Sequence, residues 1–177
     1  ACTDRGVVAM NTPGQNSNAV AELVFGMMVY MARACFSGKS GSELKDKKIG
    51  VHAYGNVGQN VGRIAKGFGM EVYAFDPFMT DEQIKAAGAT PLKSVEEMYS
   101  LCDYISLHIP ATAETKKSIN YDLLNRMPKG GVLVNTARKE VIDEEGILKL
   151  MADRPDFKYI SDIAPDNAAD FAPYEGR

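Results

Sequence analysis

A glycine-rich turn and an acidic residue stand at the spacing that binds a dinucleotide. The turn reads Ala-Tyr-Gly-Asn-Val-Gly over residues 53–58, and the acid, Asp76, ends the next apolar segment. In such a turn Gly55 lets the backbone approach a pyrophosphate, and Gly58 lets the following helix pack closely on the strand. The free N–H groups of the helix start hold the phosphates, and the acid hydrogen-bonds the adenosine ribose. We therefore predict a dinucleotide site formed by Tyr54, Gly55, Asn56, Val57, Gly58 and Asp76.

Two alternatives to a dinucleotide site stay open for this turn. A tight strand-to-helix turn needs small residues whether or not it binds a ligand, and Asp76 could then be a solvated loop acid. Enzymes that bind S-adenosylmethionine also use a glycine-rich turn and an acid after the second strand, usually with a looser glycine pattern. The joint agreement of position and spacing favours the dinucleotide.

The residues around Asp76 favour NAD over NADP. A carboxylate repels the 2′-phosphate of NADP, Pro77 follows it, and no arginine stands beside it to receive a phosphate. Ala53 takes the place of the first glycine of the pattern. An alanine fits there if the backbone φ stays negative.

Alternating apolar and amphipathic segments predict the fold that positions this turn. Apolar strands separated by helices are typical of a parallel sheet covered on both faces, with ligands at the carboxyl ends of the strands. We therefore predict an α/β, doubly wound fold of the Rossmann type. Strands are expected over residues 7–10, 48–53, 71–76, 103–110, 130–137 and 158–163. Helices are expected from Asn16 onward and over residues 56–68, 80–87, 94–101, 121–125 and 143–151.

Length and composition exclude several classes of protein. The chain has 177 residues, 45% of them hydrophobic and 24% charged, which fits one globular domain. A net charge of -3 gives no reason to expect nucleic acid or an anionic membrane as a partner. Three scattered cysteines argue against a disulfide framework and a metal site and favour the cytoplasm. The most apolar segment, residues 19–32, is shorter than the roughly 20 residues of a membrane-spanning helix.

The two ends of the chain read as the interior of a longer sequence. The first residue is Ala1, and residues 1–14 resemble the middle of a fold rather than a signal peptide. We expect residues 1–177 to be a single nucleotide-binding domain taken from a longer protein.

Four segments carry a resemblance to a known family. They include NTPG followed by AEL, LHIP followed by a threonine, and NTAR followed by VIDE, and they cover residues 11–23, 54–77, 102–116 and 127–148. In these segments the chain resembles the NAD-binding domain of the D-2-hydroxyacid dehydrogenases. Residues 11–23 are closest to the branch that oxidises 3-phosphoglycerate. The resemblance implies NAD as cofactor, a small 2-hydroxy acid as substrate, and a second domain that is almost wholly absent here.

The resemblance also implies roles for residues beyond the glycine turn. Arg138 matches the catalytic arginine that clamps the substrate carboxylate, for which a planar guanidinium is suited. Asp162 matches an acid that holds the nicotinamide carboxamide, and His108 and Pro110 match residues that line the nicotinamide and ribose pocket. The cofactor set further includes Thr136 and Ala137. His52 has no counterpart, and we expect it to be a packed or tautomer-fixed core residue.

Two further positions depart from the family pattern. Asn167 stands where the family has a glutamate that supports a catalytic histidine, with Asp166 one position early. Lys139 replaces a glycine after the arginine, and the histidine itself is expected beyond Arg177. The acid–base half of the site is therefore expected to be modified, and the chain alone is expected to be inactive.

Several functions stay open. The resemblance implies hydride transfer between NAD and a D-2-hydroxy acid, with 3-phosphoglycerate oxidised to 3-phosphohydroxypyruvate for serine biosynthesis as the favoured reaction. The alternatives are another 2-hydroxyacid dehydrogenase, such as a glyoxylate or hydroxypyruvate reductase, an NAD-sensing corepressor-like protein of the same fold, or a methyltransferase.

The apolar segment 19–36 predicts a homodimer. Its apolar residues are too many for one contact stripe, and in the resembling family this helix lies at a two-fold interface. A glutamate at Phe25 or Met28 is expected to split such a dimer if either residue lies at its centre.

Overall fold

Six parallel strands form one sheet in the computed structural model, which describes residues 2–177. The strands are β1 (Lys48–His52), β2 (Glu71–Phe75), β3 (Thr90–Pro91), β4 (Tyr104–Leu107), β5 (Val132–Asn135) and β6 (Lys158–Ser161). Their order across the sheet is β3-β2-β1-β4-β5-β6, so the chain reverses its direction of travel between β1 and β4. This is the doubly wound order, and it confirms the predicted fold class.

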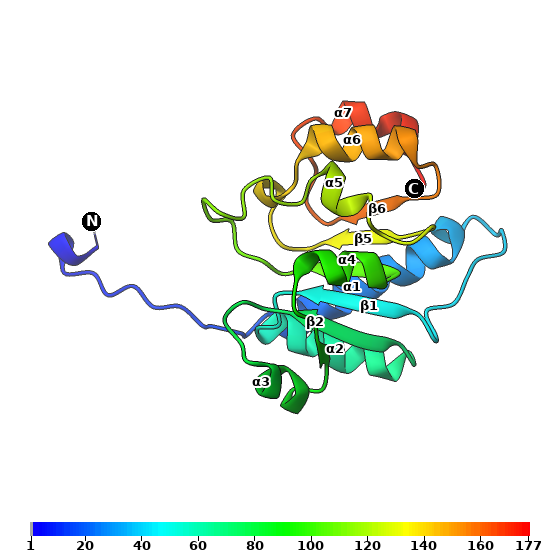
Figure 1. Cartoon of the computed structure of the whole chain (residues 1–177). Helices are drawn as coiled ribbons and strands as arrows, with labels where there is room; N and C mark the ends of the chain where they lie inside the picture. The colour runs from blue at the N-terminus through cyan, green and yellow to red at the C-terminus, as the bar shows by residue number, and fades with distance from the viewer. Residues whose placement is uncertain (1) are drawn as a thin grey trace.

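Helices cover both faces of the sheet (Figure 1). The helices α1 (Ser17–Ala32) and α2 (Asn56–Gly67) pack on one face, and α4 (Val95–Leu101), α5 (Tyr121–Leu124) and α6 (Glu144–Asp153) pack on the other. Two short helices, α3 (Asp81–Ala86) and α7 (Ala168–Phe171), lie outside these layers. Short 3₁₀ turns are formed by Thr3–Arg5, Ala34–Phe36, Lys139–Val141 and Ala172–Tyr174.

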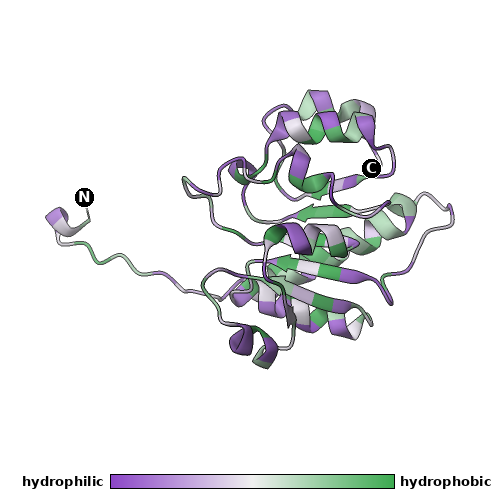
Figure 2. Ribbon diagram, viewed as in Figure 1, coloured by the Kyte–Doolittle hydropathy of each residue, from purple (hydrophilic) through white to green (hydrophobic). Residues whose placement is uncertain are grey.

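The strands are apolar because both of their faces are covered. Every residue of β4 and β5 is buried, and Figure 2 shows the apolar colouring of β5. One core cluster joins the sheet to α1 and α2, and a second joins it to α4, α5 and α6. Burial on both faces explains the continuous apolar runs that predicted parallel strands.

The register brings the carboxyl ends of five strands to one edge. His52 pairs with Phe75 on one side and with Leu107 on the other. Leu107 pairs in turn with Asn135, which pairs with Ser161. The residues that follow these positions are therefore neighbours, although they come from distant parts of the sequence.

The strands of the structure differ from the expected set in two places. Residues 7–10 are not a strand but part of an extended arm that leaves the body of the molecule, with Met10 91% exposed (Figure 1). Apolar content alone cannot form a strand, because strand pairing needs a partner to accept its backbone hydrogen bonds. Conversely, the two-residue strand β3 was not predicted, and it pairs with β2 at the edge of the sheet.

The helix α1 has one exposed face rather than apolar contacts all round. Phe25 and Met28 are buried within the chain, so neither residue lies on a surface that could form the centre of a dimer interface. The exposed large apolar residues of the helix are Leu23 and Tyr30, at 44% and 39%. The helix α2 covers the inner face, which leaves the opposite face open.

Candidate cofactor-binding site

A cavity of about 930 Å³ opens at the carboxyl ends of β1, β2 and β4. It lies where the strand order reverses, which is the usual ligand position in a doubly wound sheet. Seven of the predicted cofactor residues line it: Gly55, Asn56, Val57, Gly58, Asp76, His108 and Pro110. The structure therefore brings these residues together around one space, although they come from three different strand ends.

The glycine turn has the open geometry that a phosphate requires. Among residues 2–177, no atom apart from those of Gly55 and its two chain neighbours lies within 4 Å of the position that a Cβ at Gly55 would take, so a ligand can approach its backbone. Gly58 is crowded, because an added Cβ would overlap the carbonyl oxygen of Ala53. The two glycines thus meet the needs that the sequence pattern assigned to them, namely ligand approach and close helix–strand packing.

Ala53 departs from the expected backbone conformation. Its φ is +75°, in the left-handed region, and not negative as expected. The chain must turn from β1 into α2 within three residues, and this turn forces a conformation that glycine adopts without strain. The structure therefore explains why the family pattern has a glycine at this position.

Asp76 organises the turn from the end of β2. Its Oδ2 accepts a hydrogen bond from the backbone N–H of Tyr54 at 2.8 Å, and its Oδ1 accepts one from Phe78 at 2.8 Å. The Tyr54 side chain is buried and does not line the cavity; its hydroxyl donates to the carbonyl of Ala87 at 3.3 Å. Tyr54 therefore contributes its backbone, and not its side chain, to the turn.

Two histidines lie side by side at the inner end of the cavity. Burial lowers the pKa of His52 to about 4, against a smaller raising effect of the Asp76 carboxylate. Burial and the nearby His52 lower the pKa of His108 to about 3, although part of the His108 ring still faces the cavity. His108 Nε2 lies 2.8 Å from the hydroxyl of Ser106. Both imidazoles are therefore neutral near pH 7 and carry no charge to a ligand.

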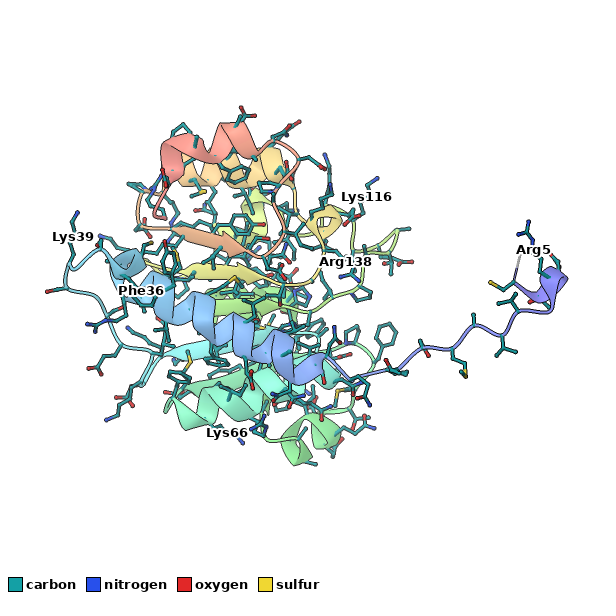
Figure 3. All side chains as sticks on the ribbon, turned by 180° about the vertical axis from the view of Figure 1, so that it is seen from behind. Arg5, Phe36, Lys39, Lys66, Lys116 and Arg138 are labelled. Atoms are coloured by element: carbon teal, nitrogen blue, oxygen red, sulfur yellow. The ribbon has the colours of Figure 1, made fainter. Side chains whose placement is uncertain are left out.

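The remaining predicted residues follow the neighbouring strands β5 and β6 and do not line this cavity. Arg138 is exposed, and its Nη1 donates to the carbonyl of Ala137 at 2.7 Å. Figure 3 shows Arg138 at the end of the sheet from which the N-terminal arm leaves. Asp162 is also exposed, one residue after β6. Among residues 2–177, the buried hydroxyl of Thr136 has no hydrogen-bond partner.

Asn135 holds the turn that presents Arg138, a role that the sequence did not reveal. Its Oδ1 accepts from the backbone N–H of Ala137 at 3.0 Å, and its Nδ2 donates to the carbonyl of Arg138 at 3.2 Å. The side chain is buried. An asparagine immediately before a strand-end turn is the signal that could have identified it, because Asn side chains commonly bond the backbone two residues on.

Comparison with known proteins places this geometry in a family. The model of the D-isomer specific 2-hydroxyacid dehydrogenase NAD-binding domain matches residues 7–170. The chain belongs to this family. It is an NAD-binding domain of the D-isomer specific 2-hydroxyacid dehydrogenases, which decides against the methyltransferase alternative.

Curated relatives and solved structures agree with the family. The chain is 35% identical over 162 residues to D-3-phosphoglycerate dehydrogenase of Bacillus subtilis, covering 84% of this chain and 31% of that protein. It is 35% identical over 159 residues to hydroxypyruvate reductase of Thermotoga maritima, covering 81% and 50%. The NAD⁺-bound 3-phosphoglycerate dehydrogenase of Entamoeba histolytica is 45% identical, with a TM-score of 0.89, covering 99% of this chain and 56% of that one. The chain thus spans about a third to a half of these relatives' length.

The residues of this dehydrogenase domain fit an NAD molecule. The open space at Gly55 leaves room for a pyrophosphate against the start of α2, and Asp76 stands beside it for the ribose. The unpartnered Thr136 hydroxyl offers a polar group next to Arg138. Within residues 2–177, no helix is long and apolar enough to cross a membrane.

Lys139 and Asn167, which depart from the family pattern near the expected acid–base group, lie close together. Lys139 forms an ion pair with Asp166. Both oxygens of Glu144 accept backbone N–H groups, from Asp166 at 2.8 Å and from Asn167 at 3.1 Å. Asn167 therefore has its backbone tied to the start of α6. These contacts join the turn after β5 to the loop after β6.

Proposed function

We propose that residues 1–177 form the NAD-binding domain of a D-3-phosphoglycerate dehydrogenase, which oxidises 3-phosphoglycerate to 3-phosphohydroxypyruvate in serine biosynthesis. The observation that carries the proposal is the common edge of the sheet. There the glycine turn and Asp76 stand beside the Asn135–Arg138 turn, because the strand register aligns their strand ends. The similarity to the dehydrogenases of Bacillus subtilis and Entamoeba histolytica supports the choice of substrate.

Each residue has a task in this reaction. Gly55, Asn56 and the start of α2 hold the pyrophosphate, and Asp76 accepts hydrogen bonds from the adenosine ribose hydroxyls. Arg138 holds the substrate carboxylate with paired N–H donors. Bound NAD supplies the acceptor for the hydride that leaves C2 of the hydroxy acid. The hydroxyl proton passes to a base, which we do not assign to a residue of this chain.

The nicotinamide half of the site uses the residues after β5 and β6. We propose that Thr136, Ala137 and Asp162 contact the nicotinamide and that His108 and Pro110 border the adjoining pocket. Asp162 is exposed and free to accept from a carboxamide, since no hydrogen bond involves its side chain among the described residues. Its backbone N–H is fixed by the carbonyl of Asn135 at 3.3 Å, which ties β6 to β5.

Calorimetry with NAD and NADP tests the cofactor assignment on the chain itself. We expect NAD to bind and NADP to bind at least tenfold more weakly, and tighter binding of NADP would refute the role of Asp76. The substrate is tested by turnover of 3-phosphoglycerate, hydroxypyruvate and glyoxylate in the protein's natural full length. The Thermotoga maritima relative makes hydroxypyruvate reduction the second candidate, and preference for hydroxypyruvate would select it.

We also propose a homodimer through the exposed face of α1, defined by Ala19, Leu23, Gly26 and Tyr30. These residues repeat at helical spacing, and Phe36, 65% exposed, extends the apolar surface beyond the helix end. Light scattering coupled to size exclusion tests the dimer. The three cysteines are free, which fits the proposed cytoplasmic location.

A further inference from the structure

His52 lies at the inner end of the cavity and has no task in the site described above. Its ring packs edge-to-face against Phe75 of β2 and Tyr99 of α4, with ring centroids 6.2 Å and 6.0 Å apart. Only 7% of the residue is exposed, and that surface borders the cavity. Asp76 and His108 are the other titratable groups that face the ring.

Tyr99 determines which nitrogen of His52 carries the proton. The phenol is fully buried, and among residues 2–177 the only hydrogen-bond partner of its hydroxyl is His52 Nδ1, at 3.3 Å. A buried O–H needs an acceptor, so the phenol donates and Nδ1 accepts. A neutral imidazole has one N–H, which must then be on Nε2.

His52 Nε2 is left as a donor without a partner. No hydrogen bond to Nε2 occurs within the described chain. The atom is also not one of the fully buried side-chain atoms that lack a hydrogen-bond partner, so it remains accessible. The open side of the ring is therefore the cavity. An N–H at this position needs an acceptor from whatever the cavity binds.

The ligand surface that reaches His52 is the base of the adenosine. Asp76, which holds the ribose, follows Phe75, and Phe75 pairs with His52 across the sheet. The cavity wall here is apolar, formed in part by Pro77, Val95 and Leu123, and it suits a flat aromatic ring. Adenine offers its ring nitrogens as acceptors.

We propose that His52 is a specificity-determining residue of the NAD site, that its Nε2–H donates a hydrogen bond to a ring nitrogen of adenine, and that Tyr99 is the positioning residue that fixes this tautomer. This assignment rests on the proposed placement of NAD in the cavity. It explains a polar side chain at the buried carboxyl end of β1.

Nucleotide analogues test the hydrogen bond without a substitution. ADP, 1-deaza-ADP, 3-deaza-ADP and 7-deaza-ADP each bind the chain through the same diphosphate, and each deaza analogue lacks one ring nitrogen. We expect one of the three to bind about tenfold more weakly than ADP, since a hydrogen bond contributes about that factor. Equal affinity of all three analogues and ADP would overturn the proposal.

His52→Leu and His52→Gln supply the matched comparison. In His52→Leu the weakened analogue and ADP should bind equally well, while nicotinamide mononucleotide, which has no adenine, should bind as it does to the wild type. His52→Gln retains an N–H donor and should keep most of the discrimination. Undiminished discrimination in folded His52→Leu would overturn the proposal.

The tautomer can be observed directly in the wild-type chain. Two histidines make the imidazole ¹⁵N spectrum simple, and we expect His52 to show a protonated Nε2 and an unprotonated Nδ1. Tyr99→Phe should populate both tautomers. A proton on Nδ1 in the wild type would contradict the role of Tyr99. Failure of the wild type to bind either NAD or ADP would instead refute the proposed placement of NAD, and the assignment of His52 that rests on it.

Discussion

Replacement of Asp76 by asparagine should abolish the preference for NAD over NADP. In the proposed placement of NAD, the Asp76 carboxylate lies at the ribose position, where the 2′-phosphate of NADP would approach it. Two unit charges about 5 Å apart repel by roughly 3 kcal/mol at an effective dielectric constant near 20. This corresponds to a discrimination of about a hundredfold, which Asp76→Asn should reduce to a few-fold.

The structure makes asparagine a better test than alanine. Asp76 accepts backbone N–H groups from both Tyr54 and Phe78, and each charge-assisted bond contributes about 1.5–3 kcal/mol. Alanine would lose both and could unfold the turn, whereas asparagine retains one acceptor. Asp103→Asn is the matched control, because Asp103 accepts the backbone N–H of Lys48 at 2.9 Å at the amino ends of the strands.

The assay is calorimetric titration of each variant with NAD and NADP, beside urea unfolding. Asp103→Asn should lose stability and keep the wild-type ratio of affinities. Asp76→Asn should lose stability and lose that ratio. A hundredfold preference that persists in folded Asp76→Asn would show that another group excludes the 2′-phosphate.

The other predictions concern pH, the glycine turn and the dimer. Both histidines have pKa values in the folded state below that of an unfolded histidine, so the unfolded state takes up protons first as the pH falls. The free energy of unfolding should therefore fall by about 2 kcal/mol per histidine from pH 7 to pH 5, as measured by urea unfolding. His52→Leu should halve this loss, and a stability that does not change with pH would contradict the burial argument. Gly58→Ala should lower the free energy of unfolding by about 1–3 kcal/mol, because its Cβ overlaps backbone atoms. Gly55→Ala should keep the wild-type stability in urea unfolding but bind NAD more weakly in calorimetry. Equal stability of the two variants would contradict this difference. Leu23→Glu should give a folded monomer in light scattering, whereas Phe25→Glu should fail to fold; a persistent Leu23→Glu dimer would place the interface elsewhere.

The sequence predicted the layers of the fold because the layers follow from local patterns. A continuous apolar run such as residues 132–134 is typical of a strand covered on both faces, and helical periodicity is typical of the helices that cover it. Pairing is not local in this way. The arm over residues 7–10 has strand-like composition without a partner, while Thr90–Pro91 has a partner without a strand-like pattern.

Half of the candidate site could be predicted because it too depends on a local pattern. The glycine turn and Asp76 belong to one strand–helix–strand unit, so their spacing in sequence determines their spacing in space. His52 meets Tyr99 across 47 positions of sequence, and no local pattern shows that its ring borders a cavity. The positive φ of Ala53 was equally hidden, because it follows from the distance that the turn must cross rather than from the residue itself.

The two halves of the site differ in how firmly their groups are held. At the proposed adenosine end, Asp76 is fixed by two backbone N–H groups, and the proposed phosphate site is backbone at the start of α2. At the other end the exposed Arg138 guanidinium donates to the carbonyl of Ala137, in its own turn. To clamp a carboxylate with two parallel N–H groups, that side chain must turn away from its own backbone. The proposed adenosine half is therefore preorganised. Arg138 can hold a substrate carboxylate only if that carboxylate replaces the 2.7 Å hydrogen bond from the guanidinium to the carbonyl of Ala137.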